Sequence, residues 1–208
     1  MRVRCLEVFV HTPDEVEIAQ LSTQFGRPHR HHATLTVSEH FLRRWGEKLR
    51  TRRGEVLFLL PRPGGVLVHR KTHYPPGVWR LLTGGVELGE AVLDALRREV
   101  QEEVGYTPSP RRFVAVVTYE FVHGPSALPF VTYMFLMAYS QHPLMPSTDG
   151  EVAETREVSL DELAHIASTL RALPGGWGDW GRFRAVAHDV TARLVSPDEL
   201  APPENRAE

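Results

Sequence analysis

One segment of the chain constrains its fold more than any other, the 23 residues GGVELGEAVLDALRREVQEEVGY at 84–106. A glycine pair opens the segment, and the rest has apolar residues at the spacing of an α-helix. With 100° of rotation per residue, these apolar side chains fall on one stripe, which must be buried against other elements. The stripe consists of Leu93, Leu96, Val100 and Val104.

Segments on both sides of this helix have the composition of strands. Before it, residues 55–71 hold two apolar runs around a Pro/Gly turn, which predicts a hairpin, and residues 78–85 predict a third strand. After it, residues 111–122 and 128–139 predict two more strands. Further helices are expected at 37–50 behind a Ser38 cap, after a polar loop from 146 behind a Ser159 cap, and at 177–195. This order predicts an α/β fold with a mixed sheet packed between helices.

The two ends of the chain are harder to interpret. Residues 4–12 have a strand-like pattern, and residues 196–208 form an acidic, proline-containing tail that we expect to fray. Histidines cluster in a tract with loop-like composition, at His29, His31 and His32. They could bind a transition metal weakly or simply be solvated.

Composition excludes several classes of partner and site. The formal net charge is −2, so no global field attracts nucleic acid or an anionic membrane. The one cysteine, Cys5, excludes an internal disulfide framework and a cysteine-based zinc site. Without a signal-peptide pattern or a long apolar segment, the chain is expected to be cytoplasmic, with no nucleic-acid or membrane partner. The excess of arginine over lysine suits phosphate binding, although a genome-wide codon bias explains it better.

Three glutamates lie close together on the helix predicted after the glycine turn within residues 84–106. With Glu99 as origin, Glu102 falls at about −60° and Glu103 at about +40°, beside the apolar stripe. Like charges at this spacing repel by roughly 0.2–0.5 kcal/mol per pair. A hard divalent cation with oxygen ligands would offset this repulsion. The alternative is an ordinary solvated face of glutamates and arginines.

Together, the glycines, the arginine and the glutamates resemble the Nudix box. Eight positions match its pattern, namely Gly84, Glu90, Arg98, Glu99, Val100, Glu102, Glu103 and Gly105. Tyr106 replaces the aliphatic residue that usually ends the box, and Thr83 stands where a glycine often precedes it.

The resemblance implies a Nudix-type α/β/α sandwich that hydrolyses a nucleoside diphosphate linked to another moiety. It implies Mg²⁺ or Mn²⁺ bound by Glu99, Glu102 and Glu103, with Glu99 and Glu103 as the main pair. The main-chain carbonyl of Thr83 or Gly84 could complete the coordination. Arg98 would orient a carboxylate, and Glu90 would support the site or bind a further ion.

The substrate and the general base stay open at this stage. The downstream markers of the ADP-ribose, dinucleoside polyphosphate and NADH hydrolases are absent. Arg70, Lys71 and Arg80 could contact phosphates or be solvated, and Glu151 or Glu154 could serve as base or extra ligand or be plain surface residues. Aromatic side chains that could stack on a base or belong to the core are Trp79, Tyr119, Phe121 and Tyr133.

The resemblance to the Nudix box also fits two other functions. A Nudix-like domain could bind a nucleotide as a sensor with weak catalysis, although the full carboxylate set favours an enzyme. Isopentenyl diphosphate isomerase shares the fold but needs a cysteine inside the domain, and Cys5 lies far before it.

The expected organisation has three parts. Residues 51–170 form the Nudix hydrolase domain, and residues 1–50 form an extension of unclear role that could cap the site or mediate a homodimer. Residues 171–208 form a C-terminal helix and tail packed on the same domain.

Overall fold

The computed structural model describes residues 12–145 and 152–203. Over these ranges an eight-stranded mixed sheet runs in the order β1-β6-β7-β2-β5-β4-β3, and β8 pairs with β4. The strands are β1 (His29–Thr36), β2 (Arg52–Leu59), β3 (Pro61–Arg62), β4 (Gly65–Lys71), β5 (Arg80–Glu87), β6 (Pro110–His123), β7 (Ser126–Met137) and β8 (Val152–Val158). The helices are α1 (Glu15–Phe25), α2 (Glu39–Lys48), α3 (Val92–Val104), α4 (Leu160–Arg171), α5 (Gly178–Leu194) and α6 (Pro197–Leu200).

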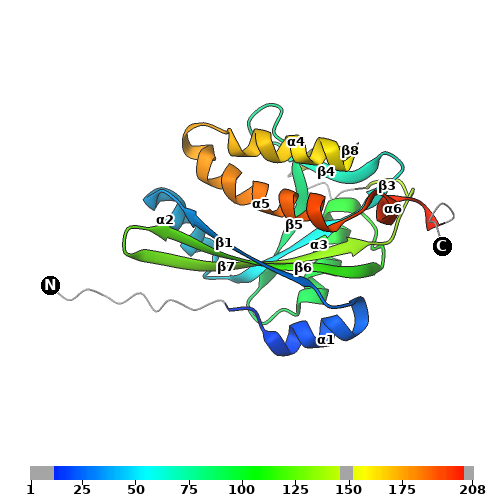
Figure 1. The fold of residues 1–208 in the computed structure, drawn as a ribbon, viewed down its shortest axis with the longest axis horizontal. Helices are drawn as coiled ribbons and strands as arrows, with labels where there is room; N and C mark the ends of the chain where they lie inside the picture. The colour runs from blue at the N-terminus through cyan, green and yellow to red at the C-terminus, as the bar shows by residue number, and fades with distance from the viewer. Residues whose placement is uncertain (1–11, 146–151, 204–208) are drawn as a thin grey trace.

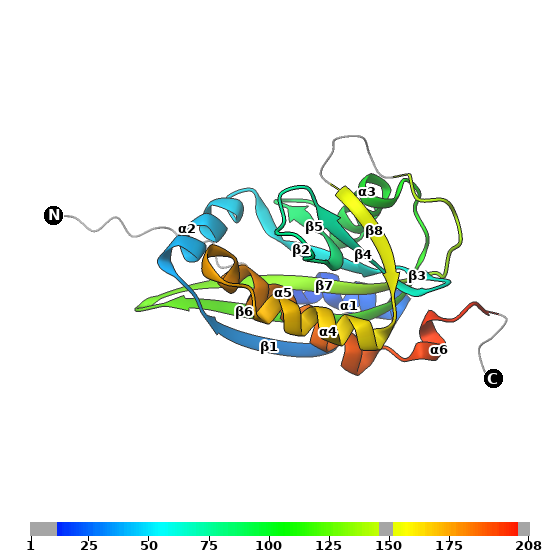
Figure 2. The ribbon, with the colours of Figure 1, turned by 90° about the horizontal axis from the view of Figure 1, so that it is seen from above.

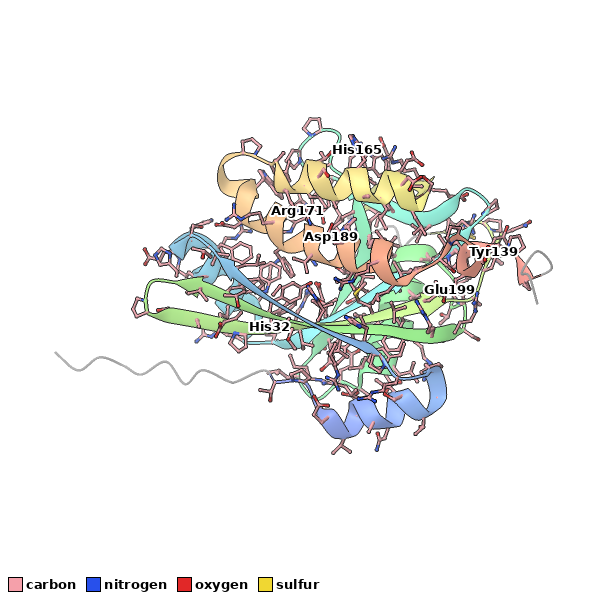
Figure 3. All side chains as sticks on the ribbon, viewed as in Figure 1. His32, Tyr139, His165, Arg171, Asp189 and Glu199 are labelled. Atoms are coloured by element: carbon pink, nitrogen blue, oxygen red, sulfur yellow. The ribbon has the colours of Figure 1, made fainter. Side chains whose placement is uncertain are left out.

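Helices cover both faces of the sheet, which confirms the predicted α/β/α sandwich. One hydrophobic cluster joins α1 and α3 to one face of the sheet. A second cluster joins α2, α4 and α5 to the other face. Figure 1 shows α4 and α5 above the strands and α1 below them, and Figure 2 shows α4 and α5 side by side across the sheet. Arg171 of α4 forms an ion pair with Asp189 of α5, and Figure 3 labels both side chains.

The predicted hairpin over residues 55–71 is wrong in its pairing. The tight turn joins only the short β3 to β4, where Pro61 lies opposite Val66. β2 instead pairs with β5 in antiparallel and with β7 in parallel orientation. The last six residues of β2 are all buried. A strand apolar on both faces fits a central position between two partners, and local turn signals do not reveal this.

The histidine tract is a strand, contrary to the expected loop. His29–Thr36 forms the edge strand β1 and pairs in parallel with β6 over eight positions. Successive side chains point to opposite faces, so His31 and His32 do not converge. Nδ1 of His32, a residue labelled in Figure 3, lies 3.0 Å from the hydroxyl oxygen of Thr118.

Three further elements differ from expectation. α1 was not predicted, and residues 152–158 of the expected polar loop form β8, which pairs with β4. Part of the tail expected to fray forms α6, where Ser196 and Glu199 make a capping box and Leu200 is buried. By contrast, Ser38 and Ser159 cap α2 and α4 as predicted.

Some expectations lie outside the described residues. They concern Cys5, Glu151, residues 4–11 of the expected strand at 4–12, and residues 204–208 of the tail. Among the helices of the described ranges, none is both long and apolar enough to cross a bilayer.

Candidate active site

The candidate site forms where β5 leads into α3. The loop between them turns at Gly89 with φ 80°, and α3 ends at Gly105 with φ 88°, a left-handed cap that favours glycine. Gly84 has another role. A Cβ built on Gly84 would lie 1.9 Å from Cδ of Glu99, so only a glycine admits this carboxylate against the strand. The Gly85 N–H donates a 2.9 Å hydrogen bond to Oε1 of Glu99.

Arg98 connects the acidic residues of the box. Its guanidinium donates two hydrogen bonds to Glu90, at 2.9 and 3.0 Å, and one to Glu99 at 2.8 Å. It also donates to the carbonyl oxygen of Gly85 at 2.8 Å. The hydrogen bonds from Arg98 hold the pKa of Glu90 below its usual value. Arg98 thus fixes Glu99 and Glu90 relative to the loop, as expected for a residue that orients a ligand.

Glu103 is buried and incompletely paired. Its side chain is 7% exposed, and its Oε1 lies 3.6 Å from Nζ of Lys71 and 3.7 Å from Nδ1 of His69. Its Oε2 is buried without a hydrogen-bond partner. Burial raises the pKa of Glu103 to about 7, against the opposing charges of Arg80 and Lys71. This carboxylate therefore retains capacity for a positive partner.

Glu102 differs from the other two box glutamates. Its side chain is 50% exposed and lies 3.5 Å from Arg98. Within residues 12–145 and 152–203, no three His, Cys, Asp or Glu side chains are arranged as a metal-binding group. The donors nevertheless fit a hard cation, because they are carboxylate oxygens and one of them, Oε2 of Glu103, is buried and unpartnered.

The three candidate phosphate-binding residues lie in different surroundings. Lys71 is next to Glu103 at the site. Arg70 donates a 2.6 Å hydrogen bond to Glu154, which was a candidate base. Arg80 is buried and donates to the hydroxyls of Tyr74 at 2.6 Å and Thr83 at 2.8 Å. Arg80 therefore braces the strand from inside the molecule.

The aromatic candidates for base stacking are mostly core residues. Tyr119, Phe121 and Tyr133 are each at most 2% exposed. Trp79 is partly buried, and the guanidinium of Arg156 lies 4.8 Å from the centre of its ring.

Sequence analysis missed two residues that contact the site. Glu17 of α1 accepts a 2.6 Å hydrogen bond from the Val92 N–H in the first turn of α3, where Ala91 offers no side-chain cap. Its other oxygen accepts from Arg53, which also donates to the carbonyl of Glu90 at 2.7 Å. Glu17 precedes Val92 by 75 residues, so no local pattern reveals this contact. The second residue is His69. The only sequence feature that could have indicated it is its position in an apolar strand.

Several curated proteins are similar to this chain in sequence. The chain is 30% identical over 108 residues to the NAD-capped RNA hydrolase NudC of Stutzerimonas stutzeri, covering 52% of this chain and 37% of that protein. It is 39% identical over 131 residues to the human NAD-capped RNA hydrolase NUDT12, covering 62% and 26%. It is 28% identical over 109 residues to the phosphatase NudJ of Escherichia coli O1:K1, covering 52% and 69%.

The region that the family model matches contains the candidate site. The chain spans little more than a third of the length of the NudC that it matches. The family model described as "NUDIX domain" matches residues 50–176, which include β5, its following loop and α3. With this match over more than half of its residues, the chain belongs to the Nudix family.

Proposed function

We propose that this protein is a metal-dependent Nudix hydrolase that cleaves the pyrophosphate of a nucleoside diphosphate linked to another moiety. One observation carries the proposal. The box carboxylates are held at the junction of β5 and α3, with Glu99 fixed by Arg98 and Gly85 and with Glu103 buried beside it with one unpartnered oxygen.

Glu99 and Glu103, one helical turn apart, are the proposed main ligands of Mg²⁺ or Mn²⁺. Glu102 at the exposed rim and the carbonyl of Thr83 or Gly84 are the proposed additional ligands. When bound, such an ion screens the phosphate charges and lowers the pKa of a bound water. Arg98 holds Glu99 and Glu90 in place, and Arg80 holds the Thr83 hydroxyl.

Lys71 is the proposed phosphate contact. Its ammonium lies 3.6 Å from Glu103, next to the proposed metal ligands. Arg70 would have to leave Glu154 to take the same role. Glu154 and Glu151 stay candidates for the general base.

The substrate class is tested with a panel. The relatives carry different printed activities, NAD-capped RNA hydrolase for NudC and NUDT12 and phosphatase for NudJ. The panel therefore holds nucleoside triphosphates, ADP-ribose, NADH, dinucleoside polyphosphates, coenzyme A and an NAD-capped RNA oligonucleotide. The last member also tests the prediction that nucleic acid is not a partner.

The experiment measures phosphate or nucleotide release with Mg²⁺, with Mn²⁺ and with a chelator. We expect metal-dependent turnover of at least one panel member. Glu99→Gln and Glu103→Gln should each lower it by roughly a hundredfold or more, the scale for losing one charge-stabilising group. Asp94→Asn removes a carboxylate from the exposed side of α3 and should leave turnover unchanged.

The alternative function has a distinct outcome. If the wild-type protein binds a nucleotide without turning it over, the catalytic proposal fails and a nucleotide sensor takes its place. The cytoplasmic location, the homodimer and the division at residues 50 and 170 stay predictions.

A further inference from the structure

His69 of β4 is the most unusual buried group outside the box. Its side chain is fully buried, and neither ring nitrogen has a hydrogen-bond partner among the described residues. Buried polar atoms are almost always paired, and leaving one unpaired costs about 1–3 kcal/mol. A fully unpaired imidazole in a strand centre therefore calls for a specific reason.

The position of the ring supplies that reason. Nδ1 of His69 lies 3.7 Å from Oε1 of Glu103, which is slightly too long for a hydrogen bond. The other oxygen of Glu103 is also buried and unpartnered. An unpaired ring nitrogen thus lies near a buried carboxylate that has one unpartnered oxygen, across a gap that a small side-chain movement would close.

His188 shows that the chain can satisfy a buried histidine where its role is structural. Its Nε2 accepts a 3.2 Å hydrogen bond from the Leu81 N–H, and its Nδ1 lies 2.9 Å from the carbonyl oxygen of Arg184. Both nitrogens are paired, and the ring links α5 to β5. His69 makes neither kind of hydrogen bond, so a structural role like that of His188 does not explain its buried position.

We propose that His69 is a positioning residue for Glu103, donating its Nδ1–H to Oε1 when the carboxylate binds a divalent cation. The inference rests on the proposed function. Carboxylates that bind metals are themselves hydrogen-bonded by an outer set of residues, which fix their orientation. Arg98 and Gly85 do this for Glu99, and His69 supplies the corresponding donor for Glu103 from the opposite side, on β4.

The surroundings of the ring favour a neutral donor. The ring is fully buried on β4, and burial disfavours a charged imidazole. A neutral imidazole carries one N–H, and Glu103 is the carboxylate nearest to Nδ1 among the contacts of His69. A neutral donor orients the carboxylate without competing with the cation for its charge, unlike the ammonium of Lys71.

Two variants of equal shape isolate the hydrogen bond. In His69→Asn, the side-chain nitrogen is bonded to Cγ as Nδ1 is, so it can still donate to Glu103. His69→Leu has almost the same shape and leaves the same space but cannot donate. We expect Mn²⁺ affinity, measured by calorimetry without nucleotide, to fall about tenfold or more in His69→Leu, the usual cost of losing such a partner. It should stay within about threefold of wild type in His69→Asn.

The outcomes separate this inference from the proposed function. Equal Mn²⁺ affinity of the Asn and Leu variants, beside a wild type whose binding depends on Glu103, overturns the inference alone. A wild type that binds no Mn²⁺, or binds it equally well as Glu103→Gln, overturns the proposed function and the inference with it. The same two substitutions at His188 should change stability but leave Mn²⁺ affinity unchanged.

A measurement on the wild-type protein covers the case in which a variant does not fold. Nitrogen-15 NMR of labelled histidines reports which ring nitrogen carries the proton. The His69 signal is assigned by its loss in His69→Asn, or by comparison with the signal of the hydrogen-bonded ring of His188. We expect His69 to be protonated at Nδ1, with its resonance shifting when Mg²⁺ is added. A proton on Nε2, or no response to Mg²⁺, overturns the inference.

Discussion

Gly84 shows how much one residue controls at this site. Its missing side chain leaves the space that the carboxylate of Glu99 occupies against β5. The sequence identified Gly84 through its place in the box. In the structure Gly84 lies inside β5, paired with Val56, and its function is close approach.

We therefore predict that Gly84→Ala displaces Glu99. The added methyl group should weaken Mn²⁺ binding by more than tenfold and destabilise the fold by about 1–3 kcal/mol through overpacking. Calorimetry and urea unfolding measure the two effects. Gly46→Ala is the control, because nothing lies within 4 Å of a Cβ at Gly46. That variant should be slightly more stable than wild type, since alanine favours a helix over glycine. Unchanged metal affinity in Gly84→Ala would contradict the assigned role of Glu99.

Glu103 predicts a pH dependence of stability in the metal-free protein. Burial raises its pKa from 4.5 to about 7, so the folded state holds a proton that the unfolded state releases between these values. The free energy of unfolding should therefore fall as the pH rises from about 4.5 to about 7. His188 acts in the opposite direction, since its lowered pKa of about 3 favours folding as the pH rises.

Comparison with Glu103→Gln isolates this contribution. Urea unfolding of both proteins, with a chelator present, should show that the variant gains stability relative to wild type as the pH rises through this window. Parallel stability curves for the two proteins would contradict the raised pKa. Adding Mg²⁺ should remove the difference in slope, because a bound cation favours the charged carboxylate.

At the scale of elements, the first turn of α3 depends on another helix. Ala91 cannot cap the helix, and Glu17 of α1 does so from 75 residues away. A charged oxygen at this end also interacts favourably with the helix dipole. The N-terminal part of the chain thereby stabilises the helix that carries the box glutamates.

We predict that Glu17→Ala destabilises the fold by roughly 1–2 kcal/mol, the usual cost of losing a cap. Glu15→Ala is the matched control on the same helix, because Glu15 pairs with Arg30 at the surface, where both side chains are largely exposed. Its effect should stay within about 0.5 kcal/mol. Urea unfolding of the two variants beside wild type tests the prediction, and equal stabilities would argue against the cap.

The elements that sequence analysis predicted well are those with local signals. Ser38 and Ser159 cap α2 and α4 through hydrogen bonds to residues three positions away. β6 and β7 are adjacent in sequence and pair as a long hairpin. β8 and β1 gave weak signals because their residues are mostly exposed or half-buried, and their conformation follows from pairing with β4 and β6.

Across the whole molecule, the described residues before and after the predicted 51–170 domain belong to the same packed structure as the box. β1 covers the edge of β6, and α5 contributes Phe183 and Val190 to the core. Arg184 of α5 donates two 2.8 Å hydrogen bonds to the buried carboxylate of Glu55 on β2. Removing such a partner leaves a buried charge uncompensated, which costs about 3–5 kcal/mol.

This packing predicts that a fragment of residues 51–170 does not fold cooperatively. It would lack β1, the helices α1, α2, α5 and α6, and Arg184, the partner of Glu55. Thermal unfolding followed by circular dichroism should give a broad, shallow transition for this fragment and a cooperative one for the full chain. Residues 12–203, which keep every described element, serve as a control and should resemble the full chain. A cooperative transition in the short fragment would support the domain boundaries predicted from sequence.

The α/β/α class, the presence of a helix within residues 84–106 and the identity of the box residues could be predicted from the sequence. These depend on periodicity, local caps and fixed spacings, which are properties of neighbouring residues. Three facts about the site depend on the folded structure: Glu99 lies against Gly84, Glu102 is exposed, and Glu103 faces Lys71 and His69. Those contacts join α3 to β4 and β5, and their distances depend on how the sheet twists and packs beneath the helix. A one-dimensional pattern records which side chains are present, whereas burial and pairing decide which of them carry an unsatisfied charge.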